Sequence, residues 1–337
     1  SNVLSMNSMF YNCTMLEDLN LNSFDTSKVT DMANMFYFCK RLNPLNLSSF
    51  ETSQVTTMVT MFYRCESLTC LDLNNFTTSK VTSMQSMFNG CYNLQNLYLS
   101  TFNTKEVTDM AYMFYSCQKL TSLYINNFDT AKVTAMNHMF SDCNIITSLD
   151  LSSFITSKVT TMQNMFFNCL ELTSLNIDNF NTQIVKDMNL MFGNCKKIKY
   201  LNINSFNVSN VLYMENMFVN CSLLKSLNLY NFNKSPVRNM NSMFSGCTMM
   251  TSLYLNNFQT PKLNTMSKMF YKCSSLSKLY IANINTNSVT SMAYMFYNCF
   301  YLTSLNLSHF KTSALKSFKQ MFYGCASLNY LNIDNFI

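Results

Sequence analysis

The sequence predicts an α/β repeat solenoid, because three side-chain patterns recur without interruption every 26 residues. A Met-Phe pair stands at Met9-Phe10 and returns at each interval through Met321-Phe322. A cysteine follows three residues after each of these phenylalanines, and a leucine column that never changes runs in the same register. Thirteen such repeats, the last one residue short, fill the chain. We therefore predict a single array of thirteen coils over residues 1–337 in place of several globular domains.

The composition argues against a nucleic-acid-binding or membrane-spanning protein. The chain has 4 Gly, 3 Pro, 2 His and no Trp, but 28 Met, 29 Phe and 14 Cys among its 337 residues. The net charge of +6 is spread over scattered lysines without a basic run, whereas nucleic-acid binding needs a clustered positive surface. No stretch approaches about 18 consecutive apolar residues. We expect no nucleic-acid partner and no direct membrane insertion.

The first half of each repeat predicts a short β-strand with one buried face. Leu19 and Leu21 alternate with outward residues, which is the period of a strand. Stacked repeats would pair these strands in parallel and form one β-sheet wall. Phe24 begins a phenylalanine column where a leucine-rich repeat usually has Asn or Cys. The turn then needs other hydrogen-bond partners, and we expect the threonine column that begins at Thr26 to supply them.

The second half of each repeat predicts a helical turn or a short helix. From Val29 to Cys39, apolar residues recur every three or four positions. We interpret Thr30 as the helix N-cap. Asn or Gly precedes the cysteine in eight repeats, as a left-handed residue that ends a helix requires. A strand wall with short helical turns opposite makes a leucine-rich-repeat-like solenoid, whose inward columns form a core only when coils stack.

The string LNSFDTSKVTDMANMFYFC, from Leu21 to Cys39, is similar to the 26-residue repeat of BspA-like leucine-rich repeat surface proteins. These proteins occur in bacteria and protists, and they are abundant among mycoplasma lipoproteins. The match extends over the whole chain. The resemblance implies an extracellular or cell-surface location, with host or neighbour surface proteins or glycans as partners. It brings no catalytic residues. Members usually carry an export signal or a lipid anchor, and we find neither in this sequence.

The cysteine and methionine columns are interpreted as core. The cysteines lack the C-x-x-C spacing of zinc, redox and haem sites, so we expect buried free thiols that pack as small hydrophobes. Alternate disulfides between coils are the other possibility. Met-x-x-Met pairs occur in twelve repeats and would suit Cu(I), but Phe318 replaces the first methionine of the last repeat, as a core position permits. We predict no cofactor, and a metal-binding protein that uses Met and Cys is the third functional alternative.

The outward position between the two inward leucines is the candidate binding surface. Tyrosine occupies it in two pairs of adjacent repeats, and each pair is expected to stack as exposed aromatic rings. Solenoids bind partners on such faces, although tyrosine also simply suits strands. The candidate binding residues are Tyr98, Tyr124, Tyr254, Tyr280, Asp72 and Asp150.

Seven N-x-S/T sequons are potential glycan acceptors. They would be used only in a eukaryote with an export route, and two of them abut a buried-looking cysteine. The glycosylation candidates are Asn46, Asn75, Asn207, Asn233 and Asn306.

Both ends of the chain are in phase with the repeat. Ser1 corresponds to Ser27, and Ile337 corresponds to Asp25, so neither end has an evident capping unit. An open end exposes core and strand edge. Two interpretations follow: the chain is a slice of a longer protein, or copies of it stack end to end into a filament.

No catalytic motif appears in the sequence. Phosphate-binding glycine loops and nucleophile elbows are missing, and His138 and His309 belong to different columns. We therefore expect a non-enzymatic structural or adhesive protein of the cell surface or extracellular space, for which end-to-end assembly with copies of itself into a filament is one open possibility. The alternative is a glycan- or protein-binding adhesin module within a longer surface protein.

Overall fold

The computed structural model describes residues 2–256 and 258–336. The chain divides into two compact units, the first comprising Ser1–Val159 with Met165–Asn179 and the second comprising Thr160–Asn164 with Phe180–Ile337. Within each unit, hydrogen bonds join residues about 26 positions apart, so successive repeats stack as coils of a leucine-rich-repeat-like β-solenoid. A single array of thirteen coils over residues 1–337 stays a prediction.

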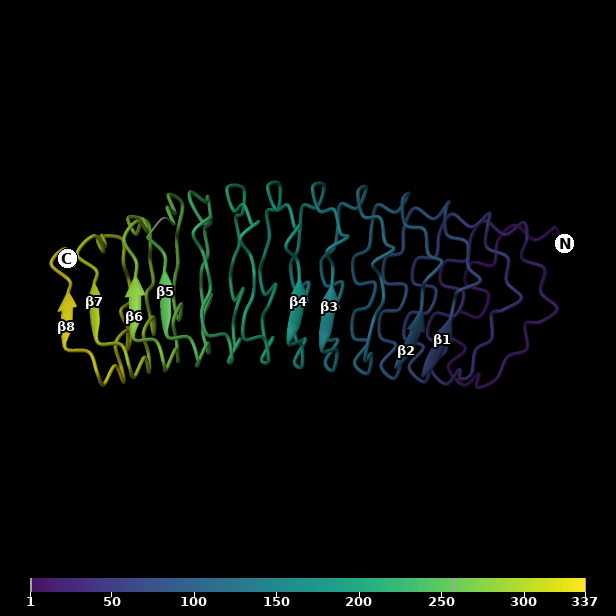
Figure 1. Cartoon of the computed structure of the whole chain (residues 1–337), viewed down its shortest axis with the longest axis horizontal. Coiled ribbons are helices and arrows are strands. Elements are labelled where there is room, and N and C mark those ends of the chain that lie inside the picture. The colour runs from purple at the N-terminus through teal and green to yellow at the C-terminus, as the bar shows by residue number, and fades with distance from the viewer. Residues whose placement is uncertain (1, 257, 337) are drawn as a thin grey trace. The chain divides into compact units, whose positions relative to one another are not determined.

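The strand wall consists of short parallel pairs (Figure 1). The pairs are β1–β2, β3–β4, β5–β6 and β7–β8, and equivalent leucines such as Leu71 and Leu97 face each other across a pair. The predicted single sheet is therefore wrong for the described residues, in which the strands form four separate two-stranded sheets. The first unit holds β1 (Cys70–Asp72), β2 (Asn96–Tyr98), β3 (Ser148–Asp150) and β4 (Ser174–Asn176). The second unit holds β5 (Ser252–Tyr254), β6 (Lys278–Tyr280), β7 (Ser304–Asn306) and β8 (Tyr330–Asn332).

The predicted helical turns are wrong, because the described residues contain no helix. In the segment that follows each valine, alternate N–H groups have different partners. The N–H of Met35 closes a turn on the carbonyl of Met32 at 3.3 Å, whereas the N–H of Phe36 reaches the carbonyl of Met61 in the next coil at 2.9 Å. An α-helix would satisfy these groups within its own coil. Here half of them hold neighbouring coils together.

Two left-handed residues per repeat keep this segment from becoming helical. Asn34 has φ 57° and Phe38 has φ 60°, and the same two columns have positive φ in every repeat. The left-handed residue before the cysteine is thus confirmed, but it ends a tight turn. The other left-handed column, that of Asn34, has no sequence signature, since it accepts residues as different as Tyr112 and Leu190.

The inward columns form a dry core. Met32, Met35 and Phe36 have no exposed surface, and the phenylalanine rings of successive repeats stack, with Phe36 and Phe62 5.7 Å apart. The cysteine column lies in this core. The thiol of Cys65 donates to the carbonyl oxygen of Phe36 at 3.2 Å. The column therefore adds hydrogen bonds between coils as well as apolar packing.

Threonines replace the usual asparagine ladder, as predicted. The hydroxyl of Thr26 donates to the carbonyl of Glu51 at 2.9 Å and accepts from the N–H of Glu51 at 2.7 Å. The predicted N-cap role of Thr30 is wrong, because its hydroxyl donates to the carbonyl of Leu4 in the preceding coil at 3.1 Å. Both threonine columns thus join neighbouring coils.

Candidate binding surface

The outward position at the end of each strand has a structural role in most repeats. Nine of the thirteen repeats place Asn or Asp there, and the side-chain oxygen accepts the N–H two residues later, as in Asx turns. Asp72 accepts from the N–H of Asn74 at 2.9 Å, and Asn306 accepts from that of Ser308 at 3.0 Å. The same bond is present at Asn20, Asn46, Asp150, Asn176, Asn202, Asn228 and Asn332.

The four tyrosines of this column cannot make the side-chain hydrogen bond that closes the turn in the other nine repeats. Tyr98, Tyr124, Tyr254 and Tyr280 have no side-chain acceptor that can close the turn, and their side chains are between 44% and 76% exposed. Beside Tyr98, the preceding coil compensates: the Asn74 side chain accepts from the N–H of Ser100 at 3.0 Å. The turn does not explain why tyrosine stands at these four positions, so they are the strongest functional candidates on the strand face.

Of the two strand-face tyrosine pairs that the sequence predicts to stack, one does so in the described residues. The rings of Tyr254 and Tyr280 lie 4.7 Å apart and are nearly parallel at 6°, because β5 and β6 pair with these two residues in register. In the part of the chain that the structure describes, no ring contact joins Tyr98 to Tyr124. Stacking was predicted for both pairs. It fails for Tyr98 and Tyr124 because no described strand pairing extends from β2 to the coil of Tyr124.

The two aspartates of the candidate set lie at turns. Hydrogen bonds from Ser152 lower the pKa of Asp150 below its ordinary value. Asp72 makes the equivalent bond to Asn74. The turn therefore accounts for both carboxylates without any ligand.

A hollow opens on the strand face of the second unit, between the coil of residues 226–230 and the coil of β5. Its volume is about 550 Å³. Tyr230 and Tyr254 are its aromatic lining residues, and Ser226, Asn228, Ser252 and Asn256 contribute polar groups. Sequence reasoning found Tyr254 but missed Tyr230, which lies two positions beyond the predicted column.

Among the five glycosylation candidates, Asn75 has a side-chain nitrogen that already donates hydrogen bonds. Its Nδ2 donates to the carbonyls of Leu47 at 2.9 Å and Phe50 at 3.1 Å. A glycan on that nitrogen would break both bonds, so Asn75 is not a suitable acceptor in the folded chain. Asn46, Asn207 and Asn306 use only their side-chain oxygen, each closing a turn. They stay predictions, as does Asn233.

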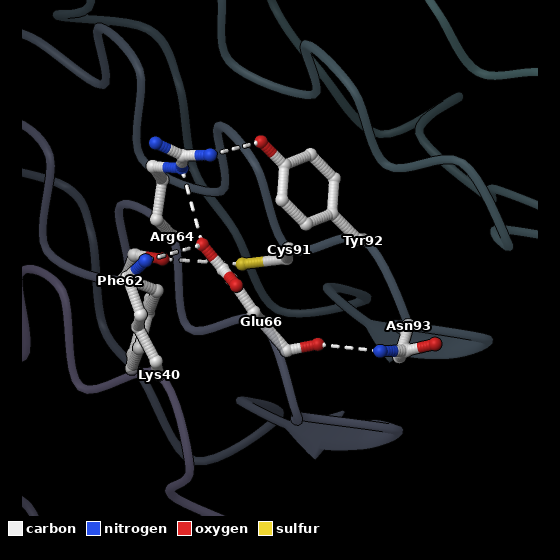
Figure 2. Close-up of polar contacts among 7 residues, drawn as sticks. All are labelled: Lys40, Phe62, Arg64, Glu66, Cys91, Tyr92 and Asn93. Carbon is white, nitrogen blue, oxygen red and sulfur yellow. Dashed lines mark hydrogen bonds and ion pairs between the residues drawn. The ribbon is translucent and has the colours of Figure 1, made fainter. Parts of the chain in front are cut away.

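A second surface feature, on the turn segment, was missed by sequence reasoning. Figure 2 shows Arg64 between Glu66 and Tyr92. Its Nη2 donates to the Tyr92 hydroxyl at 2.7 Å, and its Nε lies 3.3 Å from Glu66 Oε1 without hydrogen-bond alignment. Lys40 lies 3.3 Å from the same oxygen. Two cations therefore share one carboxylate, which leaves a locally positive cluster.

This cluster adjoins a ladder of tyrosines. Tyr37 stacks on Tyr11 at 4.5 Å and on Tyr63 at 4.6 Å. Tyrosine stands in this column, directly after the Met-Phe pair, in seven of thirteen repeats, and that frequency was the signal available in the sequence. Gly90 makes room beside it: with φ +75°, a β-carbon there would lie 2.7 Å from Arg64 Cγ.

Burial shifts the pKa values of several thiols and of both histidines. Burial raises the pKa of Cys91 and of Cys143 to about 12, so these thiols are protonated at neutral pH. Burial lowers the pKa of His138 and His309. Within residues 2–256 and 258–336, no three His, Cys, Asp or Glu side chains gather as a metal site would require.

The comparison with protein families decides the relationship of the chain. The model of the family described as "Mycoplasma protein of unknown function, DUF285" matches residues 1–98, 69–169, 144–256 and 248–336. The chain belongs to this family. The predicted relationship to 26-residue bacterial surface-protein repeats is thereby confirmed. No curated protein matches this DUF285 chain at a significant level.

Several solved structures are similar to this DUF285 chain. One is a leucine-rich repeat protein from Bacteroides ovatus, with 18% identity, coverage of 83% of this chain and 76% of the other, and a TM-score of 0.45. Another is a leucine-rich cell surface protein from Faecalibacterium prausnitzii, with 15% identity, 82% and 75% coverage and a TM-score of 0.36. A third is a leucine-rich repeat protein from Eubacterium ventriosum, with 15% identity, 81% and 82% coverage and a TM-score of 0.34.

In the described portion of the chain, no helix has the length and apolar character needed to cross a lipid bilayer.

Proposed function

We propose that this DUF285 chain is a non-catalytic adhesive module of the cell surface or extracellular space that binds a protein or a glycan through its strand face. The observation that carries the proposal is the stacked, exposed pair Tyr254 and Tyr280. Both residues occupy a column in which the fold favours Asn or Asp. Family membership and the resemblance to surface-protein repeats support the location.

Tyrosine is suited to this role. Its ring offers a large, rigid contact area with a polar tip, and binding surfaces are enriched in it. The pair is already held in place by the pairing of β5 with β6, so ordering the rings on binding costs little entropy. A preorganised aromatic patch on a regular scaffold is typical of a recognition surface.

The experiment replaces both rings with the residue that the repeat prefers. In the double variant Tyr254→Asn and Tyr280→Asn, each new amide can close its own turn, so folding is preserved. We expect binding to immobilised host matrix proteins or printed glycans to fall about tenfold, as for loss of a central aromatic contact. Tyr301→Ser is the matched control, since Tyr301 is exposed but lies outside the strand column. Unchanged binding by the double variant would refute the proposal.

End-to-end assembly is the second candidate. The first described coil exposes Val3 and Met9, whose equivalents Val29 and Met35 are fully buried in the next coil, so a further coil would cover them. That coil would come from the same polypeptide or from a second copy. Light scattering of residues 1–337 across a concentration series tests the latter, with Met9→Lys as the disrupting variant. Growth in mass that this variant abolishes would support a filament, and a mass equal to one chain throughout would exclude it.

A further inference from the structure

We propose that the hollow lined by Tyr230 and Tyr254 binds a neutral saccharide. The inference rests on the proposed function of the strand face and names the ligand class for that face. It is carried by three observations: a local break in the threonine ladder, a rearrangement of the core in the same repeats, and the composition and size of the lining.

The hollow lies between two coils that lack the usual threonine bridge, because Lys234 stands in the threonine column of the first of them. In the second unit the Thr182 hydroxyl bonds both the carbonyl and the N–H of Asn207, at 2.8 and 2.7 Å. The next two repeats have Val208 and Lys234 in place of threonine, and neither side chain has a hydroxyl that could make these two hydrogen bonds. Thr260 then resumes the column. Two consecutive repeats therefore lack the link that fixes the spacing of their neighbours.

The core rearranges at the same place. The rings of Phe232 and Phe258 meet edge-on, at 65° and 5.7 Å, whereas the equivalent rings Phe102 and Phe128 in the first unit are parallel within 8°. Ser235 supplies substitute hydrogen bonds. Its N–H donates to the carbonyl oxygen of Gln259 at 2.9 Å, and its hydroxyl donates to the carbonyl oxygen of Val211 at 3.0 Å. The hydrogen bonds of Ser235 thus take the place of the missing threonine bridge. On the strand face, the coil of residues 226–230 forms no described strand pair with β5.

The lining has the chemistry of a saccharide site. Aromatic faces pack against the apolar C–H faces of sugar rings, while amides and hydroxyls bond the sugar hydroxyls. Tyr230 is 73% exposed, and Tyr254 is held by its stack on Tyr280. The hydroxyl side chains Ser226 and Ser252 line the same hollow.

Charge and size narrow the ligand class. The lining residues are Ser, Asn, Leu and Tyr without a charged side chain, so an ionic ligand would lose hydration without gaining a counter-charge. The volume of about 550 Å³ falls within the range of about 300–1,000 Å³ that is usual for small-ligand sites. A neutral mono- or disaccharide fits both requirements.

The test measures binding of the whole 337-residue chain to an array of neutral and acidic glycans, followed by saturation-transfer NMR with the best neutral disaccharide. We expect Tyr230→Ser to weaken neutral-glycan binding about tenfold. Serine is common at the equivalent position of other repeats, so this variant should fold. The double variant Val208→Thr and Lys234→Thr should weaken it similarly while keeping every lining ring, because restored bridges close the hollow. Tyr98→Asn, on the first unit, is the control and should bind normally.

The outcomes separate this inference from the broader proposal. Failure of the wild-type chain to bind any neutral glycan, or undiminished binding by Tyr230→Ser, would overturn the saccharide site. In that case, loss of matrix-protein binding in the Tyr254→Asn and Tyr280→Asn double variant would still support a protein-binding strand face. If that double variant binds matrix proteins and glycans as the wild-type chain does, the strand-face function itself fails.

Discussion

The hydroxyl of Thr52 donates to the carbonyl oxygen of Thr77 at 3.0 Å and accepts from the N–H of Thr77 at 2.7 Å. One buried side chain thus satisfies both backbone groups of a residue in the next coil. Unpaired, each of those groups would be costly to bury. This bridge lets a phenylalanine spine coexist with a turn that other leucine-rich repeats hold with asparagine.

Replacing Thr52 with Val should lower the free energy of unfolding by about 2 kcal/mol, because two hydrogen bonds are lost at nearly constant volume. Urea denaturation followed by circular dichroism measures the change. Thr77→Val is the control, since Thr77 is exposed and its bonds to Thr52 involve only its backbone. Equal stability of the two variants would show that the bridge contributes nothing.

Asn306→Ala should destabilise the chain by about 1 kcal/mol, the usual contribution of one hydrogen bond. Asn306→Asp should have little effect, because Asp72 and Asp150 close the same turn in their own repeats. Thermal unfolding of the three proteins gives the comparison. If Ala and Asp are equally harmful, the side-chain oxygen is not what stabilises the turn.

Thr60→Asn should raise the free energy of unfolding by about 1 kcal/mol. Thr60 has φ 52°, a left-handed conformation that is unfavourable for a β-branched residue and better tolerated by asparagine. Asn34, Asn164 and Asn216 already occupy the same column with positive φ. Thr56→Asn, outside that column, should not stabilise the protein and serves as the control in the same urea titration. A loss of stability in Thr60→Asn would contradict the expectation.

Stability should fall steeply in alkali. Burial raises the pKa of Cys91, Cys143 and Cys221 from 9.0 to about 12 in the folded chain. Below pH 9 these thiols are protonated in both states. Between pH 9 and 12 only the unfolded chain releases their protons, so rising pH favours unfolding by about 1.4 kcal/mol per thiol and pH unit.

Melting temperatures measured from pH 8 to 11 test this linkage. Cys91→Ala should show a shallower decline than the wild-type chain, since one titrating thiol is removed. A native-state thiol titration provides a second check: the exposed Cys13 and Cys70 should react quickly, and buried thiols such as Cys91 only on unfolding. An identical pH dependence in the variant would contradict the assignment.

The sequence by itself determined the repeat length, the inward columns and the bridging threonines. These features follow from periodicity and from side-chain chemistry, and stacking repeats the same environment in every coil. A column occupied by Leu, Phe, Met or Cys throughout must face the core, because no other environment tolerates it repeatedly. The sequence also predicted that adjacent tyrosines stack, but only strand pairing decided that Tyr254 and Tyr280 do so while Tyr98 and Tyr124 do not.

Only the tertiary structure decided between a helix and a series of turns. Apolar residues spaced three or four apart suit both, and the choice depends on whether an N–H such as that of Phe36 bonds within its coil or reaches Met61 in the next. The hollow beside Tyr230 likewise lies between two coils that lack the threonine bridge, and the Lys234 that replaces the threonine has no evident meaning until that bridge is known. Hydrogen bonds between coils, which no local pattern encodes, settled both features.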